Sequence, residues 1–308
     1  MNRQPNVMIG IVTYGSRRAS SLCQVIESAM AQTVEPQEIV IVDNASCPEI
    51  QETLRRYPKV KYIDPGENTG PAGGYCRIIL HARANKGTDF LLLLGDDSLL
   101  STKDAIEIYL EEFQRIKDSI EPNLGCLTCT RGELTINLKI TKGRLVRCQQ
   151  QSDPYGVHLC GNSGLFVNRN VFENVNYRQD LFFGIEDFYF CASIFKAGYK
   201  IYKIPHNLIT FTEPIPVKST IRFMNKQIIL CPCWKTYYGT RNYLVFYKYL
   251  FGQQSIAFIL LTIKTIATAF ILMITGHLRH SKYMLMGLFD FFRNKMGKTI
   301  EPEGYDEN

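Results

Sequence analysis

The chain has 308 residues, of which 45% are hydrophobic and 21% are charged, and this balance excludes a globally disordered protein. Its length predicts one large domain, or one domain with an appendage. The formal net charge of +6 comes without a dense run of lysine and arginine, so a nucleic-acid partner is not expected. A mildly basic chain suits an anionic substrate or an anionic membrane surface.

The cysteines and the start of the sequence indicate a reducing compartment. Several of the ten cysteines lie within apolar segments, and residues 1–6 are polar and do not resemble a secretory signal. We therefore expect reduced thiols in a cytosolic protein. The pairs Cys126/Cys129 and Cys231/Cys233 leave a structural zinc site as an alternative, although their spacing alone does not bring the two pairs together.

The first third of the sequence alternates strand-like and helix-like segments. Apolar or β-branched runs predict strands at residues 7–14, 38–42, 60–63 and 90–94. Helical spacing of apolar side chains predicts helices at residues 20–31 and 103–117, and another that runs through Ala84. Strands that alternate with helices at this spacing predict a right-handed, parallel α/β sheet.

Two acidic residues follow the last of these strands. Gly95 ends the apolar run at residues 90–94, and Asp96 and Asp97 come directly after it. Ligands of parallel sheets bind outside the carboxyl ends of the strands, and adjacent carboxylates raise each other's pKa unless a cation lies between them. A divalent cation that holds a diphosphate fits this corner. The alternative is a solvated turn in which Asp97 or Ser98 caps the following helix.

Polar and glycine-rich residues follow the second and third strands. Asp43, with Asn44 beside it, can hold the ribose or base edge of a nucleotide, and an Asx turn is the alternative. The glycine-rich residues 68–74 lack the ending of a phosphate loop, and a dinucleotide fingerprint would follow the first strand instead. We expect these glycines to let the backbone approach a ligand, with Asn68 and Gly73 lining a nucleotide-sugar pocket.

The middle of the sequence predicts shorter strands and a second acidic pair. Strands are expected at residues 125–131, 134–140 and 144–149, and the last two are joined in a hairpin at 141–143. The small residues of segment 161–167 either allow it to pass close to a bound sugar or let the chain turn into a strand. Glu186 and Asp187 begin a helix that runs to Ala197. The helix dipole favours carboxylates there, and a rigid carboxylate at a pocket rim can also remove a proton from an acceptor hydroxyl.

An edge strand at residues 198–204 is expected to end at Pro205, with His206 just beyond it. A lone histidine is often structural, but an imidazole near a carboxylate-bound cation is a candidate metal ligand.

From Cys231 onward the sequence becomes aromatic and then apolar. Residues 234–251 are rich in aromatic side chains, including Trp234, and contain Arg241 and Asn242 in the middle. We therefore divide the chain into a catalytic domain at residues 1–230 and a helical, acceptor- or membrane-associating region at residues 231–308.

Two segments of this C-terminal region predict contact with a membrane surface. Residues 255–275 are long enough to span a bilayer, but Lys264 near their centre makes an isolated span costly. Residues 282–298 form a basic, amphipathic segment. We expect in-plane or protein-packed helices rather than a true span.

Taken in order, these segments resemble the family 2 glycosyltransferases, and more narrowly their bacterial rhamnosyl- and galactofuranosyltransferase branch. The matching pieces are Ile11-Val12-Thr13-Tyr14, Ile41-Val42-Asp43-Asn44-Ala45-Ser46, Asn68-Thr69-Gly70-Pro71-Ala72-Gly73-Gly74, Gly95-Asp96-Asp97-Ser98, Glu186-Asp187 and Tyr237-Tyr238-Gly239-Thr240-Arg241-Asn242. Each piece is short, but the ordered set covers most of the chain. The resemblance implies a GT-A (Rossmann-like) fold and an inverting transfer from a nucleotide sugar.

The resemblance also implies a role for each matched residue. Asp187, with Glu186 beside it, matches the catalytic base, and Asp97 matches the acid that holds Mg²⁺ or Mn²⁺ against the diphosphate. Arg241 and Asn242 match a family signature, which we assign together with Trp234 to the acceptor side. The nucleotide-sugar contacts are expected from Thr13, Tyr14, Asp43, Asn44, Asn68, Gly73, Gly74 and Asp96.

Two departures from the family pattern concern the metal. Ser98 stands where a third acidic residue is usual. The family often has a metal-binding histidine about six residues past the proline, whereas this chain has Phe211-Thr212-Glu213 there and its nearby histidine is His206. We keep Asp97 and His206 as the expected metal ligands.

The expected function is transfer of rhamnose or galactofuranose from a dTDP- or UDP-linked donor to a lipid-linked glycan acceptor in bacterial surface polysaccharide synthesis. The protein is expected to be cytoplasmic and peripheral on the inner face of the cell membrane, and a homo-oligomer is left open. The alternatives are a non-catalytic nucleotide-sugar or glycan-binding member of the fold, a membrane-anchored scaffold, and a dehydrogenase, which the missing fingerprint disfavours.

Overall fold

The computed structural model describes residues 3–130, 137–142, 144–149, 152–213, 219–224 and 226–303. The chain forms two compact units. Unit 1 consists of Met1–Ile140, Leu145–Arg178 and Asp187–Glu213, and unit 2 of Thr141–Arg144, Gln179–Glu186 and Pro214–Asn308. The assignment of a catalytic domain to residues 1–230 and of an acceptor- or membrane-associating region to residues 231–308 stays a prediction.

Unit 1 is built on an eight-stranded sheet with the order β3-β2-β1-β4-β10-β6-β11-β9. Its strands are β1 (Val7–Thr13), β2 (Glu38–Asp43), β3 (Val60–Ile63), β4 (Phe90–Gly95), β6 (Leu124–Thr130), β9 (Tyr155–Val157), β10 (Leu165–Asn168) and β11 (Lys200–Asn207). Strands β3, β2, β1 and β4 run parallel, and β10 lies antiparallel between β4 and β6. The predicted α/β fold with a mainly parallel sheet is therefore confirmed.

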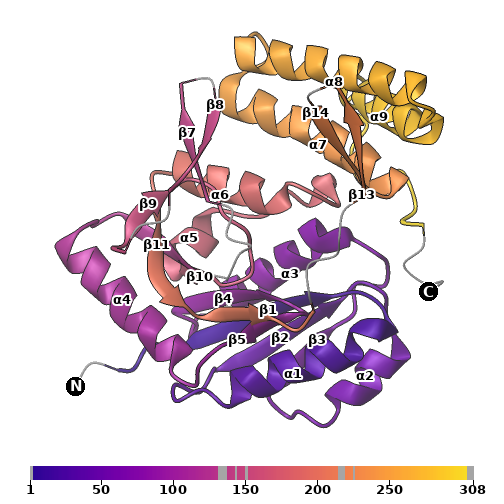
Figure 1. Cartoon of the computed structure of the whole chain (residues 1–308). Coiled ribbons are helices and arrows are strands. Elements are labelled where there is room, and N and C mark those ends of the chain that lie inside the picture. The colour runs from indigo at the N-terminus through magenta and orange to yellow at the C-terminus, as the bar shows by residue number, and fades with distance from the viewer. Residues whose placement is uncertain are drawn as a thin grey trace. The chain divides into compact units, whose positions relative to one another are not determined.

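Helices cover both faces of this sheet (Figure 1). They are α1 (Ala19–Met30), α2 (Pro48–Leu54), α3 (Gly70–Ala84), α4 (Ala105–Ser119), α5 (Arg169–Asn174) and α6 (Glu186–Lys196), with a 3₁₀ turn η1 (Ser16–Arg18) before α1. Alternate residues of each strand point to opposite faces. Ile9, Ile41 and Leu92 therefore share one core cluster with α1, α2 and α4, while α3 packs on the other face against β1 and β2.

Strand β11 lies inside the sheet and not at its edge. It pairs parallel with β6 on one side and antiparallel with β9 on the other. Pro205 does not end this strand, which continues to Asn207, but the register with β6 shifts between Lys203 and Asn207. A proline has no N–H for the ladder, so the strand can include it only at such an irregularity. The expectation of an edge strand was wrong because the short strand β9 has little apolar signal of its own.

Short strand pairs complete the β structure. Strands β5 (Ser98–Leu100) and β12 (Ile209–Phe211) form an antiparallel pair beside the acidic turn, with Phe211 opposite Ser98. Strands β7 (Leu138–Thr141) and β8 (Arg144–Arg147) form the expected hairpin, and β13 (Ser219–Phe223) pairs with β14 (Lys226–Leu230). Residues 131 and 134–136 of the expected strands, and Gly143 of the expected turn, lie outside the described residues.

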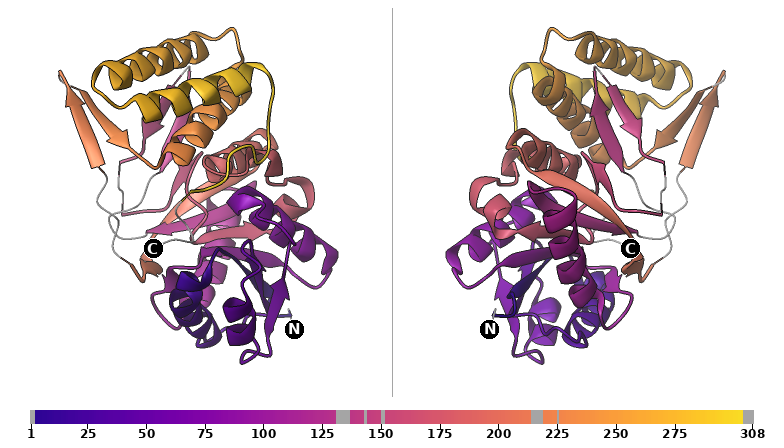
Figure 2. Two further views of the ribbon diagram at one scale, coloured as in Figure 1. Left: turned by 90° about the vertical axis from the view of Figure 1, so that its right-hand side faces the viewer. Right: turned by 90° about the vertical axis from the view of Figure 1, so that its left-hand side faces the viewer.

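Unit 2 contains three long helices, α7 (Cys233–Phe251), α8 (Ile256–Ile274) and α9 (Leu278–Phe292), and a 3₁₀ turn η2 (Gln179–Leu181). The three helices pack against one another, as both views in Figure 2 show. Among the described residues, α8 is the one helix that is long and apolar enough to cross a membrane by length and composition, with a mean hydropathy of 2.3 and 17% of its residues buried. Several of its large apolar side chains, among them Ile263 and Phe270, are exposed in the described part of the chain.

Candidate active site

The acidic corner after β4 begins with Asp96, whose carboxylate is held by the end of β1. The hydroxyl of Thr13 donates to Oδ2 of Asp96 at 2.9 Å. Burial raises the pKa of Asp96 to about 6, against the opposing influence of the Arg18 guanidinium and the hydrogen bonds from Thr13 and the Tyr14 backbone. Burial therefore outweighs the one nearby cation, and a second positive charge at this corner would favour the ionised carboxylate.

Asp97 and Glu213 converge on the same guanidinium. Nη1 of Arg18 lies 3.2 Å from Oε2 of Glu213 and 4.0 Å from Oδ2 of Asp97, while Nε lies 4.0 Å from Oδ1 of Asp96. The β5–β12 pair produces this convergence, because the N–H of Thr212 donates to the carbonyl of Asp97 at 2.9 Å. Three carboxylates from two distant parts of the sequence thus surround one cationic group.

His206 lies beside a different carboxylate. Its Nε2 is 3.8 Å from Oε1 of Glu112 on α4. In the described part of the chain, no three His, Cys, Asp or Glu side chains gather in an arrangement that could hold a metal ion by themselves. All ten cysteines are reduced thiols, and neither cysteine pair belongs to a zinc cluster within the described ranges.

The residues present nevertheless fit a hard divalent cation that arrives with a diphosphate. Mg²⁺ is usually bound by one or two protein carboxylates and completes its shell with phosphate oxygens and water. The side chains of Asp97 and Glu213 are 32% and 56% exposed, so their oxygens are accessible, and Arg18 already shows that a cation is favoured between them. A three-residue cage is therefore not required for a metal at this corner.

The residues expected on the nucleotide side form their hydrogen bonds largely with neighbouring groups of the protein. Asp43 is fully buried, accepts from the N–H groups of Ala45 and Cys47 at 3.0 and 2.7 Å, and accepts from the Tyr62 hydroxyl at 3.1 Å. This is the Asx-turn arrangement. Asn44 is also buried, and it fixes the start of α3 by accepting from Thr69 and donating to the Gly70 carbonyl at 3.0 Å.

Asn68 and the two glycines that follow it also contact the protein itself. Oδ1 of Asn68 accepts from the N–H of Gly70 at 2.9 Å. A Cβ atom at Gly74 would lie 2.7 Å from Cγ1 of Val12, and one at Gly73 would lie 2.5 Å from Cβ of Thr69. Gly74 therefore lets α3 pack closely on β1, and Gly73 leaves room for the Thr69 side chain just before the same helix.

A stack of aromatic rings connects the end of β4 with α6. The Tyr75 hydroxyl donates to the Leu94 carbonyl at 3.0 Å, and its ring stacks on Tyr177 with centroids 5.4 Å apart. Tyr177 in turn stacks on Phe190 of α6 at 4.1 Å, and its hydroxyl donates to Oδ1 of Asn162 at 2.6 Å. The end of β4 and the part of α6 that contains Phe190 are therefore connected by one aromatic stack.

Asp187 lies in the first turn of α6, where its Oδ1 accepts from the N–H of Phe188 at 2.7 Å. The carboxylate is partly exposed, as a base that meets an incoming hydroxyl must be. Arg241, Asn242 and Trp234 lie in α7 of unit 2 and are 0, 0 and 2% exposed. Arg241 and Asn242 donate to backbone carbonyls of the loop before α6.

Sequence reasoning missed four residues of this arrangement. Arg18 and Glu213 carry no motif of their own, although Glu213 lies only two residues beyond the position where the family often has histidine. Tyr75 and Tyr177 read as ordinary core residues, because only the tertiary fold stacks them.

Comparisons with known proteins identify a family and similar structures. The model of the family described as "Glycosyl transferase family 2" matches residues 8–174. Galactofuranosyltransferase GlfT1 of Mycolicibacterium smegmatis is 32% identical over 88 residues, which cover 28% of each chain. GlfT1 of Mycobacterium tuberculosis is 33% identical over 95 residues, or 30% of each chain. The match thus spans less than a third of these relatives' length.

Two solved structures share the fold. Mannosyltransferase PcManGT from Pyrobaculum calidifontis, in complex with GDP-Man and Mn²⁺, aligns with a TM-score of 0.54 and 13% identity, over 95% of this chain and 88% of that one. GalNAc-T7 with UDP, GalNAc and Mn²⁺ aligns with a TM-score of 0.51 and 16% identity, over 67% of this chain and 44% of that one. These likenesses confirm the GT-A type of fold. Because the family model covers more than half of the sequence, the chain belongs to glycosyl transferase family 2.

Proposed function

We propose that this protein transfers a sugar from a nucleotide diphosphate donor to a glycan acceptor, with inversion of the anomeric centre. The observation that supports the proposal is the aromatic stack of unit 1, in which Tyr75 and Tyr177 connect the last residues of β4 with Phe190 of α6. One acidic pair follows that strand, and the other begins that helix. Family membership supplies the reaction class. Galactofuranose is the first candidate sugar, because the curated relatives are galactofuranosyltransferases, and rhamnose is the second.

Asp97 and Glu213 are proposed to hold a Mg²⁺ or Mn²⁺ ion at the first corner, with Asp96 behind them. When bound, such an ion neutralises the diphosphate as the negative charge of the leaving group grows. Glu213 replaces His206 in this proposal, because it shares Arg18 with Asp97 whereas His206 lies beside Glu112. Arg18 adds a positive charge at the same place and can pair with phosphate oxygens once the donor is bound.

Asp187 is proposed to act as the general base. Its carboxylate accepts the proton of the acceptor hydroxyl while the oxygen forms a bond to the anomeric carbon of the donor sugar. The bond between that carbon and the diphosphate oxygen breaks, and the diphosphate leaves with the electron pair. A single displacement without an enzyme nucleophile inverts the configuration. Thr13, Asp43, Asn44 and Asn68 are proposed to shape the nucleotide side through the turns that they stabilise.

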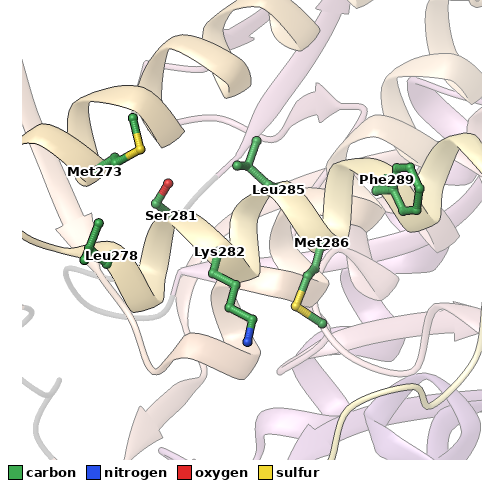
Figure 3. A pocket seen from close by; sticks show the side chains of 7 residues that line it. All are labelled: Met273, Leu278, Ser281, Lys282, Leu285, Met286 and Phe289. Carbon is green, nitrogen blue, oxygen red and sulfur yellow. The ribbon is translucent and has the colours of Figure 1, made fainter.

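The C-terminal helices are proposed to dock on an anionic membrane surface that carries a lipid-linked acceptor. An apolar pocket of about 500 Å³ lies between the end of α8 and α9. Figure 3 shows the side chains that line it. Its lining comes from Met273 of α8 and from Leu278, Ser281, Lys282, Leu285, Met286 and Phe289. Lys282 is the charged member of this lining, so an acyl or prenyl chain in the pocket would meet a cation suited to its phosphate. A peripheral position on the cytoplasmic face follows from this proposal.

The proposal is tested by measuring transfer from UDP-galactofuranose and dTDP-rhamnose to a lipid-linked acceptor with Mn²⁺, in the wild type and in Asp187→Asn. We expect one donor to be used by the wild type, and the variant to bind that donor with unchanged affinity while transfer falls at least about 100-fold. Wild-type turnover in Asp187→Asn would remove Asp187 from the base role. Donor binding by the wild type without any transfer or hydrolysis would favour a non-catalytic binding protein instead.

A further inference from the structure

The loop that leads into α6 has an unusual backbone. Phe182 and Ile185 have φ angles of 63° and 70°, and Gly184 between them has 78°. A left-handed φ is uncommon outside glycine, and for a bulky or β-branched residue it is an outlier that persists only when surrounding contacts impose it. Two such residues within four positions directly precede Glu186 and Asp187.

Two neighbouring residues of α7 donate hydrogen bonds to carbonyls of this loop. Nδ2 of Asn242 donates to the carbonyls of Leu181 and Phe183 at 2.7 and 2.8 Å, and lies 3.4 Å from that of Gly184. Nη2 of Arg241 donates to the Leu181 carbonyl at 3.1 Å, so that this carbonyl accepts from both side chains. The Arg241 Nε also donates to Oδ1 of Asn242 at 3.0 Å, which orients the amide.

Arg241 is costly to bury, because among the described residues its charge faces uncharged oxygens and two tyrosine rings instead of a carboxylate. The guanidinium is 0% exposed, and within the described ranges no carboxylate pairs with it. Nη1 donates to the Gly297 carbonyl at 2.9 Å, and the rings of Tyr237 and Tyr238 lie 5.5 and 5.0 Å from its centre. A buried charge without an ionic partner is costly, and a planar guanidinium fork can hold two chain segments at once.

We propose that Arg241 and Asn242 are positioning residues, which hold the loop of residues 181–185 in its strained form and thereby fix the direction in which the first turn of α6 presents Glu186 and Asp187. This inference rests on the proposed function, because the positioned carboxylate is the proposed base. It assigns the Arg-Asn pair a role other than contact with the acceptor. The bonds that carry it all lie within unit 2.

The strain is tested without any activity assay. Ile185→Gly and Ile185→Ala both remove the same packing, but glycine accepts a positive φ and alanine does not. We expect Ile185→Gly to melt about 2 °C or more above Ile185→Ala when Asn242 is present. When Asn242→Ala is added to each of these two variants, the loop relaxes, and we expect the difference between their melting temperatures to disappear. The idea that Asn242 imposes the strain would be overturned if the two variants melted at the same temperature with Asn242 present, or if their difference were unchanged with Asn242→Ala.

The positioning role is tested by separating donor binding from turnover. In Asn242→Ala we expect calorimetric affinity for the donor with Mn²⁺ to stay within about twofold of the wild type, while the kcat of transfer falls about 10- to 100-fold, as a displaced catalytic group predicts. Tyr243→Phe, on the exposed side of the same helix, serves as the matched control and keeps both values. A wild-type kcat in Asn242→Ala would overturn the positioning role, as would a loss of donor affinity equal to the loss of kcat.

Arg241→Lys adds a second variant that keeps the charge but loses the fork. We expect its kcat to fall with donor affinity retained, and hydrogen exchange at the amides of residues 181–190 to quicken relative to Tyr243→Phe. Unchanged exchange would overturn the clamp. If the wild type shows no transfer with any donor, the proposed function fails, whereas the melting gap and the exchange rates still decide whether the pair holds the loop.

Discussion

The hydroxyl of Thr13 donates a hydrogen bond to Oδ2 of Asp96 at 2.9 Å, and this bond joins the end of β1 to the acidic turn after β4. Both side chains are largely buried, and burial raises the pKa of Asp96 to about 6. The two neighbouring strands therefore end in a single polar corner whose geometry is fixed before any ligand binds.

Thr13→Val is expected to destabilise the protein by about 1–3 kcal/mol, because it keeps the shape of the side chain but removes a donor from a buried carboxyl. Urea unfolding at pH 7 measures the loss. Thr13→Ser retains the hydroxyl and should recover most of it. Equal stability of the valine and serine variants would mean that the hydrogen bond contributes nothing to the fold.

Glu213→Gln is expected to weaken Mn²⁺-dependent donor binding about tenfold, because it removes one negative ligand from the shell that the diphosphate completes. His206→Gln serves as the control, and its binding should match the wild type, since His206 lies beside Glu112. Calorimetry with and without Mn²⁺ separates the metal-dependent part of the affinity. The opposite ranking of the two variants would restore His206 as the ligand and exclude Glu213.

Gly74→Ala is expected to cost about 1–3 kcal/mol, because the new methyl group would overlap the Val12 side chain and force α3 away from β1. Gly239→Ala, in the open on α7, is the matched control, where nothing lies within 4 Å of the new atom. It should stabilise by about 0.5–1 kcal/mol through helix propensity. Thermal melting shows whether each variant is less or more stable than the wild type. If Gly74→Ala left the stability unchanged, α3 would be able to move away from β1 at no cost in free energy.

His158 is expected to make the protein less stable as the pH falls through 6.5. Burial, and then Lys139 and Lys200, lower the pKa of His158, and its Nδ1 accepts from the N–H of Ile140 at 2.8 Å. Protonation therefore favours the unfolded chain, whose imidazole titrates near about 6.5. The difference in melting temperature between the wild type and His158→Gln should be constant above this pH and should shrink below it. A difference that does not change with pH would remove His158 as a cause.

Ile263→Glu combined with Phe270→Glu is expected to abolish sedimentation with anionic phospholipid vesicles. Both side chains lie on the outer face of α8 and are more than half exposed, at 56 and 57%. If α8 entered the bilayer, each introduced glutamate would carry its charge into the acyl region, which is costly, so the helix is expected to stay outside the bilayer. Leu80→Glu on the exposed side of α3 is the control and should sediment like the wild type. If the wild type, the double variant and Leu80→Glu all bound the vesicles equally, the outer face of α8 would not be the membrane contact.

Strands β1, β2, β3 and β4 of unit 1 could be predicted from the sequence, because each depends on a local apolar pattern. The apolar run of residues 90–94 has enough hydrophobic side chains to be buried on both faces, and β4 lies in the middle of the sheet as that pattern implies. The prediction that β11 lies at the sheet edge was wrong, because its partner strand has no local pattern that marks it. The partner that covers it, β9, is three residues long and is recruited by the sheet rather than by its own propensity.

The sequence by itself determined the α/β class, the order of the motifs and the acidic pairs at Asp96/Asp97 and Glu186/Asp187, because residue type and spacing are local properties of the chain. Only the tertiary structure decided which side chains meet. It set Glu213 beside Arg18 across 195 positions of sequence, and it turned Arg241 and Asn242 toward the carbonyls before α6. Such contacts depend on strand pairing and helix packing between distant segments, and no local pattern specifies them.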